Sequence, residues 1–164
     1  MTLDVRAAGA DDLPAIKAIY DQEVRHGIAT FAVEPPGLDY WRERLESTQP
    51  GDHVLVATEA GAVVGYAYSG SYRPREAYAR TREASVYLAA GARGRGVGRL
   101  VYDELLTRMR DDDVHLVVAV IAVPNPASQA LHRACGFVRA GVLHDVGHKL
   151  GRWIDTELWE LRIS

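Results

Sequence analysis

The segment GARGRGVGRL, residues 91–100, places four glycines and three arginines directly ahead of an apolar helical pattern. The N-terminus of a helix presents unpaired backbone N–H groups at the positive end of the helix dipole, a combination that binds phosphate. Glycines let the backbone approach an anion closely, and arginines offer planar, bidentate donors. The segment therefore predicts a phosphate-binding turn; the alternative is a glycine-rich surface turn.

Spacing separates the three phosphate-binding patterns that such a segment could represent. A P-loop requires GxxxxGK[ST], and the sequence contains no Gly-Lys pair. The dinucleotide fingerprint requires GxGxxG in the first βαβ unit, whereas Gly94, Gly96 and Gly98 come late, after a pattern typical of an antiparallel hairpin. The third pattern, [QR]xxGxG, fits the sequence RGRGVG at residues 93–98.

A second chemical feature lies just upstream, in the strand-like segment EASVYL at residues 83–88. Because side chains alternate along a strand, Glu83, Ser85 and Tyr87 share one face and the apolar residues between them share the other. A carboxylate, a hydroxyl and a phenol on one face indicate a polar cleft rather than a core. For Glu83 the alternative is an ion pair with Arg80 or Arg82 on a solvated edge.

Two other sets of reactive side chains carry less weight. His144 and His148 are four residues apart, as in some zinc helices, but the sequence DVG between them is typical of a turn or strand end. Since neither an HExxH motif nor a cysteine ligand accompanies them, we expect no metal site. Cys135 is better suited to a small buried thiol on an apolar helix stripe than to a nucleophile.

Hydrophobic periodicity indicates which elements position these residues. It predicts strands at residues 3–8, 83–89 and 115–123, two strands joined by a turn within 53–72, and two more within 137–163; helices carrying residues 13–24, 39–47, 97–109 and 126–135; and an irregular loop at 27–37. Asn125 is expected to cap the last helix, with an apolar stripe formed by Ala127, Ala130, Leu131, Ala134 and Cys135. This order predicts a mixed α/β sheet in one domain.

Composition is consistent with an ordinary globular chain. The 164 residues include 48% hydrophobic residues and one cysteine, and the net charge of −3 argues against a general nucleic-acid binder. We expect a cytoplasmic protein with no membrane partner, because no leader, lipidation signal or long apolar run occurs.

The arginine–glycine turn resembles the pyrophosphate-binding turn of the Gcn5-related N-acetyltransferases, which use acetyl-coenzyme A. The preceding strand, the following apolar strand and the helix opened by Asn125 match the family order. Segments 29–36, 65–88, 117–137 and 147–161 resemble the phosphinothricin and methionine sulfoximine acetyltransferase subgroup. The similarity extends over nearly the whole chain, and fold and cofactor transfer more safely than substrate.

The resemblance implies a single acetyltransferase domain, residues 1–164, with a central, mostly antiparallel sheet and about four helices. It implies direct acetyl transfer to a small amino acid or its phosphinate, sulfone or sulfoximine analogue, with Glu83 as general base, directly or through a water. The implied acetyl-CoA contacts are Val86, Tyr87 and Leu88, the turn residues Arg93, Gly94, Arg95, Gly96, Val97, Gly98 and Arg99, and Asn125 and Ser128.

The resemblance further assigns Phe31, Arg73, Arg75, Tyr78 and Tyr87 to the acceptor, although a charge run in residues 73–83 could simply be solvated. His132 is either the acid that protonates the departing thiolate or a packed helix histidine. A homodimer is expected. The rival functions are acetylation of a protein N-terminus or another amine, and a non-catalytic acyl-CoA sensor.

Overall fold

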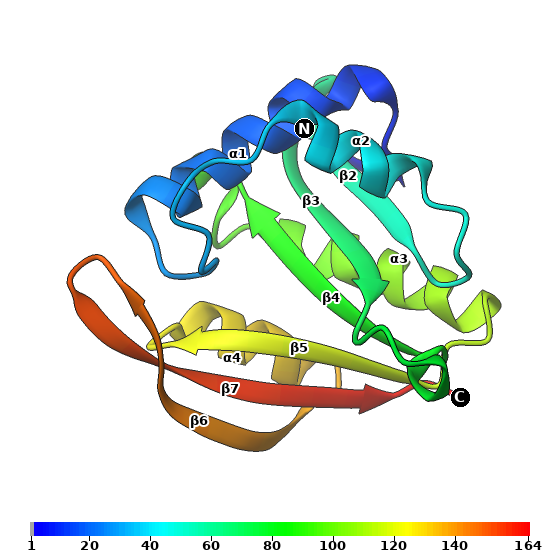
Figure 1. Ribbon diagram of the computed structural model, residues 1–164. Helices are drawn as coiled ribbons and strands as arrows, with labels where there is room; N and C mark the ends of the chain where they lie inside the picture. Colours follow the sequence, from blue (N-terminus) through cyan, green and yellow to red (C-terminus); the bar gives the residue numbers. More distant parts are fainter. Residues whose placement is uncertain (1) are drawn as a thin grey trace.

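A seven-stranded sheet forms the centre of the computed structural model, which describes residues 2–164 (Figure 1). Its strand order is β1-β2-β3-β4-β5-β7-β6. The strands are β1 (Leu3–Ala7), β2 (His53–Glu59), β3 (Ala62–Ser71), β4 (Thr81–Leu88), β5 (Leu116–Val123), β6 (Val138–Lys149) and β7 (Arg152–Arg162). All neighbouring strands are antiparallel except β4 and β5. The predicted mixed, mostly antiparallel sheet is confirmed.

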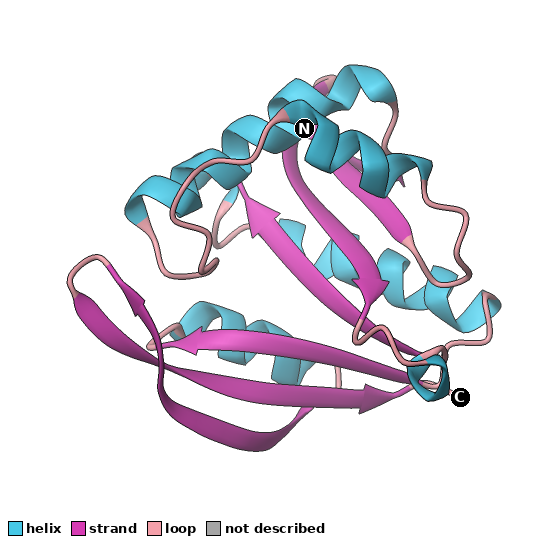
Figure 2. Cartoon of the chain, in the orientation of Figure 1, coloured by secondary structure: helices cyan, strands magenta, loops and turns pink. Residues whose placement is uncertain are grey.

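Four α-helices cover the two faces of the sheet (Figure 2). They are α1 (Leu13–His26), α2 (Leu38–Glu46), α3 (Val97–Asp111) and α4 (Pro126–Ala134). One core cluster joins α1 and α2 to the sheet through Tyr20, Trp41 and Tyr66, and a second joins α3 through Val101 and Leu105. None of these helices is long and apolar enough to cross a membrane.

The parallel strands β4 and β5 are hydrogen-bonded only near their N-terminal ends. Residues 81–83 pair with residues 116–118, and beyond this point β4 continues beside β3 while β5 continues beside β7 (Figure 1). The two strands therefore diverge like the arms of a V. Val120 of the apolar strand β5 lines the resulting gap and is 43% exposed.

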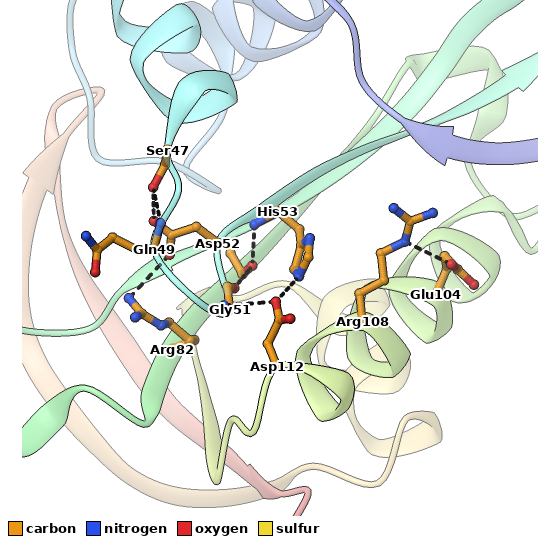
Figure 3. Close-up of polar contacts among 10 residues, drawn as sticks. Ser47, Gln49, Gly51, Asp52, His53, Arg82, Glu104, Arg108 and Asp112 are labelled. Carbon is orange, nitrogen blue, oxygen red and sulfur yellow. Dashed lines mark hydrogen bonds and ion pairs between the residues drawn. The ribbon is translucent and has the colours of Figure 1, made fainter.

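A network of polar side chains, which we call the polar clasp, ties the loop after α2 to β4 and to the end of α3 (Figure 3). The Asp52 carboxylate accepts a hydrogen bond from Ser47 and pairs with the buried Arg82 of β4 at 3.3 Å. The Asp112 carboxylate lies 2.7 Å from His53 Nε2. The clasp fixes α2 relative to the strand that carries Glu83.

Local contacts at the starts of two helices are informative. The Asp12 carboxylate, just before α1, binds the Gly9 N–H and the Arg6 guanidinium rather than capping the helix. The apolar stripe predicted on α4 is correct only for Leu131 and Cys135, which pack against the core; its three alanines are exposed, and His132 is the buried residue of the helix. The Asn125 cap is confirmed, since its side chain accepts the Ser128 N–H at 3.1 Å.

Candidate active site

The gap between β4 and β5 contains a cavity of about 480 Å³. Residues of β4, β5, α4 and the start of α3 line it. The residues predicted to bind cofactor that line it are Val86, Tyr87, Leu88, Arg93, Gly94, Gly96, Val97, Gly98, Arg99, Asn125 and Ser128, and His132 lies beside them. Segments far apart in the sequence thus meet around one elongated space.

Left-handed glycines shape the turn at the head of α3. Gly94 and Gly96 have φ values of +73° and +81°, which residues with a side chain rarely adopt. Gly96 immediately precedes the helix, whose first-turn N–H groups lack intrahelical partners, and the first-turn residues Val97, Gly98 and Arg99 line the cavity. A side chain at either glycine would project into open space. The geometry fits a diphosphate seated against backbone donors.

The arginines of this turn are paired with carboxylates of the chain itself. Arg93 lies 3.3 Å from Glu23 of α1, and Arg99 lies 2.8 Å from Asp103 one helical turn later. Arg95 binds both carboxylate oxygens of Glu59, at 2.8 and 2.9 Å, and does not line the cavity. The structure therefore does not bring Arg95 to the place predicted for it.

Along β4, successive residues direct their backbone N–H and C=O groups alternately toward β3 and toward the gap. Ala89 N–H donates to Val64 of β3 at 2.9 Å, so alternate residues preceding it also direct their backbone groups toward β3. The N–H groups of Val86 and Leu88 consequently face the gap, where β5 has already diverged. Tyr87 differs from its neighbours because its backbone belongs to the β3 pairing and its side chain packs on the α1 side.

Glu83 occupies the last position at which β4 and β5 pair. An ion pair of Glu83 with Arg80 or Arg82, the alternative predicted from sequence, is excluded, because Arg80 pairs with Asp113 and Arg82 with Asp52. Burial raises the pKa of the Glu83 carboxyl above its ordinary value, while the charges of Arg44 and Arg73 act in the opposite direction. A partly desolvated carboxylate with a raised pKa is suited to accept a proton.

An aromatic wall borders Glu83 on the face covered by α1 and α2. Tyr87 packs against Tyr20, Tyr66 and Tyr68, with ring centroids 5.2 to 6.5 Å apart. Its hydroxyl donates to the Ala29 carbonyl at 3.3 Å, and burial raises the pKa of the phenol well above its ordinary value. Tyr87 thus forms part of a neutral, rigid wall.

Both ring nitrogens of His132 are engaged. Nδ1 donates to the Ser128 carbonyl at 2.7 Å, so Nε2 accepts the hydrogen bond from the Tyr102 hydroxyl at 3.0 Å. The ring is 4% exposed and makes edge contacts with Phe137. Burial lowers the pKa of the imidazole, which favours its neutral form. These contacts favour the packed histidine over the thiolate acid.

The residues assigned to the acceptor lie on two segments. Arg73, Arg75 and Tyr78 are exposed in the loop between β3 and β4, where the Arg73 guanidinium lies 5.1 Å from the ring of Tyr72. Phe31, in the loop after α1, lies directly against Gly147 of β6. The structure does not place these four residues on the lining of the main cavity.

Sequence reasoning missed two cations near this loop and wall. Lys149 is buried and donates to the carbonyls of Thr30 at 2.8 Å and Glu23 at 3.1 Å, which ties the β6–β7 hairpin to the loop after α1. Arg44 of α2 lies over the Tyr40 and Tyr68 rings. No local pattern reveals either role, since both depend on contacts between distant segments.

The family model for the acetyltransferase (GNAT) domain matches residues 5–159. The chain belongs to the GNAT acetyltransferase family. Phosphinothricin N-acetyltransferase of Alcaligenes faecalis is 47% identical over 158 residues, which cover 95% of this chain and 80% of the relative. L-Methionine sulfoximine/L-methionine sulfone acetyltransferase of Pseudomonas aeruginosa is 38% identical and aligns with 100% of this chain and 96% of its own length.

A solved GNAT structure extends the similarity to three dimensions. Phosphinothricin acetyltransferase from Sinorhizobium meliloti, in complex with acetyl-CoA, superposes with a TM-score of 0.93 and is 39% identical. The match covers 99% of this chain and 89% of the solved one. The chain is an acetyl-CoA-dependent N-acetyltransferase of the phosphinothricin and methionine sulfoximine subgroup, as the resemblance predicted.

Two further features of this GNAT domain bear on the chemistry. Burial and the neighbouring Asp103 raise the pKa of the Cys135 thiol to about 11, so the thiolate required of a nucleophile is disfavoured. Within residues 2–164, no three histidine, cysteine or carboxylate side chains gather as metal ligands.

Proposed function

We propose that the enzyme transfers acetyl from acetyl-CoA to the α-amine of a small amino acid bearing an acidic or strongly polar end group, such as phosphinothricin, methionine sulfoximine or methionine sulfone. One observation carries this proposal. Glu83, with its raised pKa, lies at the apex of the gap, between the cofactor cavity on one side and cations without carboxylate partners on the other.

Different residues of the gap would bind different parts of acetyl-CoA. The first turn of α3 would hold the diphosphate, with Gly94 and Gly96 leaving room for it. Val86 and Leu88 would donate backbone N–H groups to the pantetheine arm and the thioester carbonyl. In a continuous sheet these groups would bind the neighbouring strand, but β5 has diverged at this point. When bound, acetyl-CoA supplies the activated acyl group.

Glu83 would take the proton from the acceptor amine, directly or through one water, as the amine attacks the thioester carbonyl. An α-amine titrates near 8, so this proton transfer requires only a moderate base. The raised pKa of Cys135 supports direct attack over a cysteine-bound acetyl group. The thiolate of coenzyme A, with a pKa near 8.5, leaves without a strong acid, in agreement with a packed His132.

Side chains on the acceptor side would recognise the polar end group. Arg73 and Arg75 project from the exposed loop, beside Tyr78, and offer the planar forks that suit a carboxylate or phosphinate. Phe31 would pack against the aliphatic part of the acceptor. An open acidic groove, which peptide substrates with free N-termini would favour, is not what these cations provide.

We also infer a homodimer formed through β6. This edge strand is 12 residues long, and Val138, Leu143 and Val146 are exposed along it, with Trp153 exposed on β7. Long apolar edges of this kind are normally covered. Sedimentation of the purified protein, compared with a Leu143→Lys variant, tests the inference: the variant should be monomeric.

The decisive experiment is thiol release from acetyl-CoA across a panel of acceptors. The panel contains phosphinothricin, methionine sulfoximine, methionine sulfone, ordinary amino acids, polyamines and short peptides. Saturable turnover confined to the first three supports the proposal. Turnover with peptides or polyamines alone overturns the acceptor assignment, and acetyl-CoA binding without any turnover indicates the non-catalytic sensor.

A further inference from the structure

Arg44 differs from every other arginine that the structure describes. Each of the others either pairs with a carboxylate or is exposed to water. Arg44 is half-buried, and no carboxylate oxygen of residues 2–164 lies within ion-pair distance of it. A half-buried guanidinium without a counter-ion has lost part of its hydration, which favours binding of an anion beside it.

Aromatic groups hold the Arg44 side chain in one orientation. Its guanidinium carbon lies 4.6 Å from the ring centroids of both Tyr40 and Tyr68, and Nη2 donates to the Tyr40 hydroxyl at 2.6 Å. The Nε–H group is buried without a hydrogen-bond partner. The rings stabilise the cation but supply no acceptor for the remaining donors, so the fork is preorganised for an anion.

The position of Arg44 relative to Glu83 indicates which anion. Arg44 Nη1 lies over Gly70 of β3, at 3.4 Å from the place where a side chain would begin. Gly70 is the residue that pairs with Glu83, and the charge of Arg44 acts on the Glu83 carboxyl. Arg44 and Glu83 therefore share the small space that the missing side chain of Gly70 leaves open.

An α-amino acid carries its amine and its carboxylate on the same carbon. An acceptor whose amine meets Glu83 must therefore place its α-carboxylate within a few bonds of the same point. The loop residues Arg73 and Arg75 are more exposed to water than Arg44, which suits recognition of the distal end group of the acceptor.

We propose that Arg44 binds the α-carboxylate of the acceptor and thereby selects α-amino acids over simple amines. This inference rests on the proposed function and divides acceptor recognition into two parts. Arg44 binds the carboxylate next to the reacting amine, and the loop carrying Arg73 and Arg75 binds the distal polar group. Arg44 is then a specificity residue that touches substrate, and Glu83 remains the base.

The test compares two acceptors that differ only in this carboxylate: methionine sulfoximine and its decarboxylated amine, 3-(methylsulfonimidoyl)propylamine. Each is assayed with the wild type, Arg44→Met, Arg44→Lys and the control Arg42→Met. Arg42 lies on the same helix but is exposed and paired with Asp39. Because both acceptors are measured on the same protein preparation, any loss of folded enzyme cancels in their ratio.

For methionine sulfoximine we expect Arg44→Met to lower kcat/KM by about 10- to 100-fold, the usual effect of losing a charge-assisted hydrogen bond. For the decarboxylated amine kcat/KM should change little, as should the KM for acetyl-CoA with both acceptors. Arg44→Lys should recover part of the discrimination, and Arg42→Met should leave it unchanged.

Equal losses for both acceptors would overturn the inference, since Arg44 would then act through Glu83 or through the fold. A wild type that already fails to distinguish the two acceptors would overturn it as well. Failure of the proposed function gives a different result: the wild type would turn over neither acceptor while acetylating peptides or polyamines, and the role of Arg44 would fall with it.

Discussion

The two regions proposed to bind anions use arginine in opposite ways. In the turn before α3 each arginine has a carboxylate of the chain as its partner: Glu23 for Arg93, Glu59 for Arg95 and Asp103 for Arg99. On the acceptor side Arg44, Arg73 and Arg75 have no such partner among the described residues. The proposed diphosphate site would therefore rely mainly on backbone N–H groups, and the proposed acceptor site on side-chain charge.

This difference follows from what each region has to recognise. A diphosphate is the same in every catalytic cycle, and a rigid backbone cradle at a helix terminus binds it without ordering long side chains. Acceptors vary, and a few guanidinium groups on a loop and a helix can be exchanged without disturbing the sheet. In this proposal the backbone would hold the diphosphate, which never changes, and side chains would hold the acceptor, which can vary.

The largest effect is expected at the point where the two regions meet. Glu83→Gln should lower kcat by about 10²- to 10⁴-fold, the range for loss of a general base. The acetyl-CoA Kd should stay unchanged, because the cradle does not involve Glu83. Steady-state kinetics and calorimetry measure the two quantities, and unchanged turnover would remove Glu83 from the mechanism.

The pH dependence of kcat/KM in the wild type is a second test of Glu83 as the base. A base acts when it is deprotonated, so kcat/KM should fall as the pH drops through the pKa of Glu83. Because burial raises that pKa, the fall should occur above the ordinary value of 4.5. An acid limb at or below 4.5 would contradict the desolvated setting of this carboxyl.

The cofactor cradle is tested by adding one methyl group. Gly96→Ala forces a side chain into the left-handed region, at a cost of roughly 1–2 kcal/mol, and should weaken acetyl-CoA binding about tenfold. Gly61→Ala is the matched control, since Gly61 has nearly the same φ, +80°, in the β2–β3 turn. Equal Kd values for the two variants would show that the backbone cradle is not where the diphosphate binds.

His132 provides a smaller catalytic effect and a measurable effect on stability. His132→Ala should lower the free energy of unfolding by about 2–4 kcal/mol, because it removes a buried ring and leaves the Tyr102 hydroxyl unpaired. Its effect on kcat should be far below the roughly 10²-fold expected for a general acid. Tyr102→Phe, measured alongside, reports the hydrogen bond alone; a large kcat loss confined to His132→Ala would restore the acid role.

The smallest effect on cofactor binding is expected for Arg95. Arg95→Ala should lower the melting temperature at neutral pH but leave the acetyl-CoA Kd nearly unchanged. Arg93→Ala changes a residue that lines the cavity and should raise the acetyl-CoA Kd. Arg95 lowers the pKa of Glu59, so the ion pair stabilises the fold above the unfolded-state pKa and is lost as the pH falls through the lowered value. The two proteins should therefore converge in stability in acid.

Much of the fold was predictable because its signals are local. Strand alternation placed Glu83 on the face opposite Val86 and Leu88, and glycine spacing identified the turn before α3. The choice between the two roles predicted for His132 could not be made from sequence, because its partners Tyr102 and Trp159 are brought there by α3 and β7. The divergence of β4 and β5 is likewise a property of whole strands and their other partners.

Charge partners were the least predictable part of the site. Arg95 looked equivalent to Arg93 in sequence, yet its partner Glu59 lies 36 residues earlier. Arg44 lies in the charged segment WRERLE, where nothing distinguishes it from a solvated residue. Which guanidinium remains available for a ligand depends on every carboxylate that the fold brings near, and periodicity contains no such information.

The seam between β4 and β5 is three residue pairs long, so backbone hydrogen bonds join the two halves of the sheet over a very short distance. A ligand in the gap that accepts hydrogen bonds from Val86 and Leu88 would form an additional connection between the two halves of the sheet. Substrate binding and mechanical stiffness would then be one property. The enzyme would be most rigid when the gap is occupied and most compliant when it is empty.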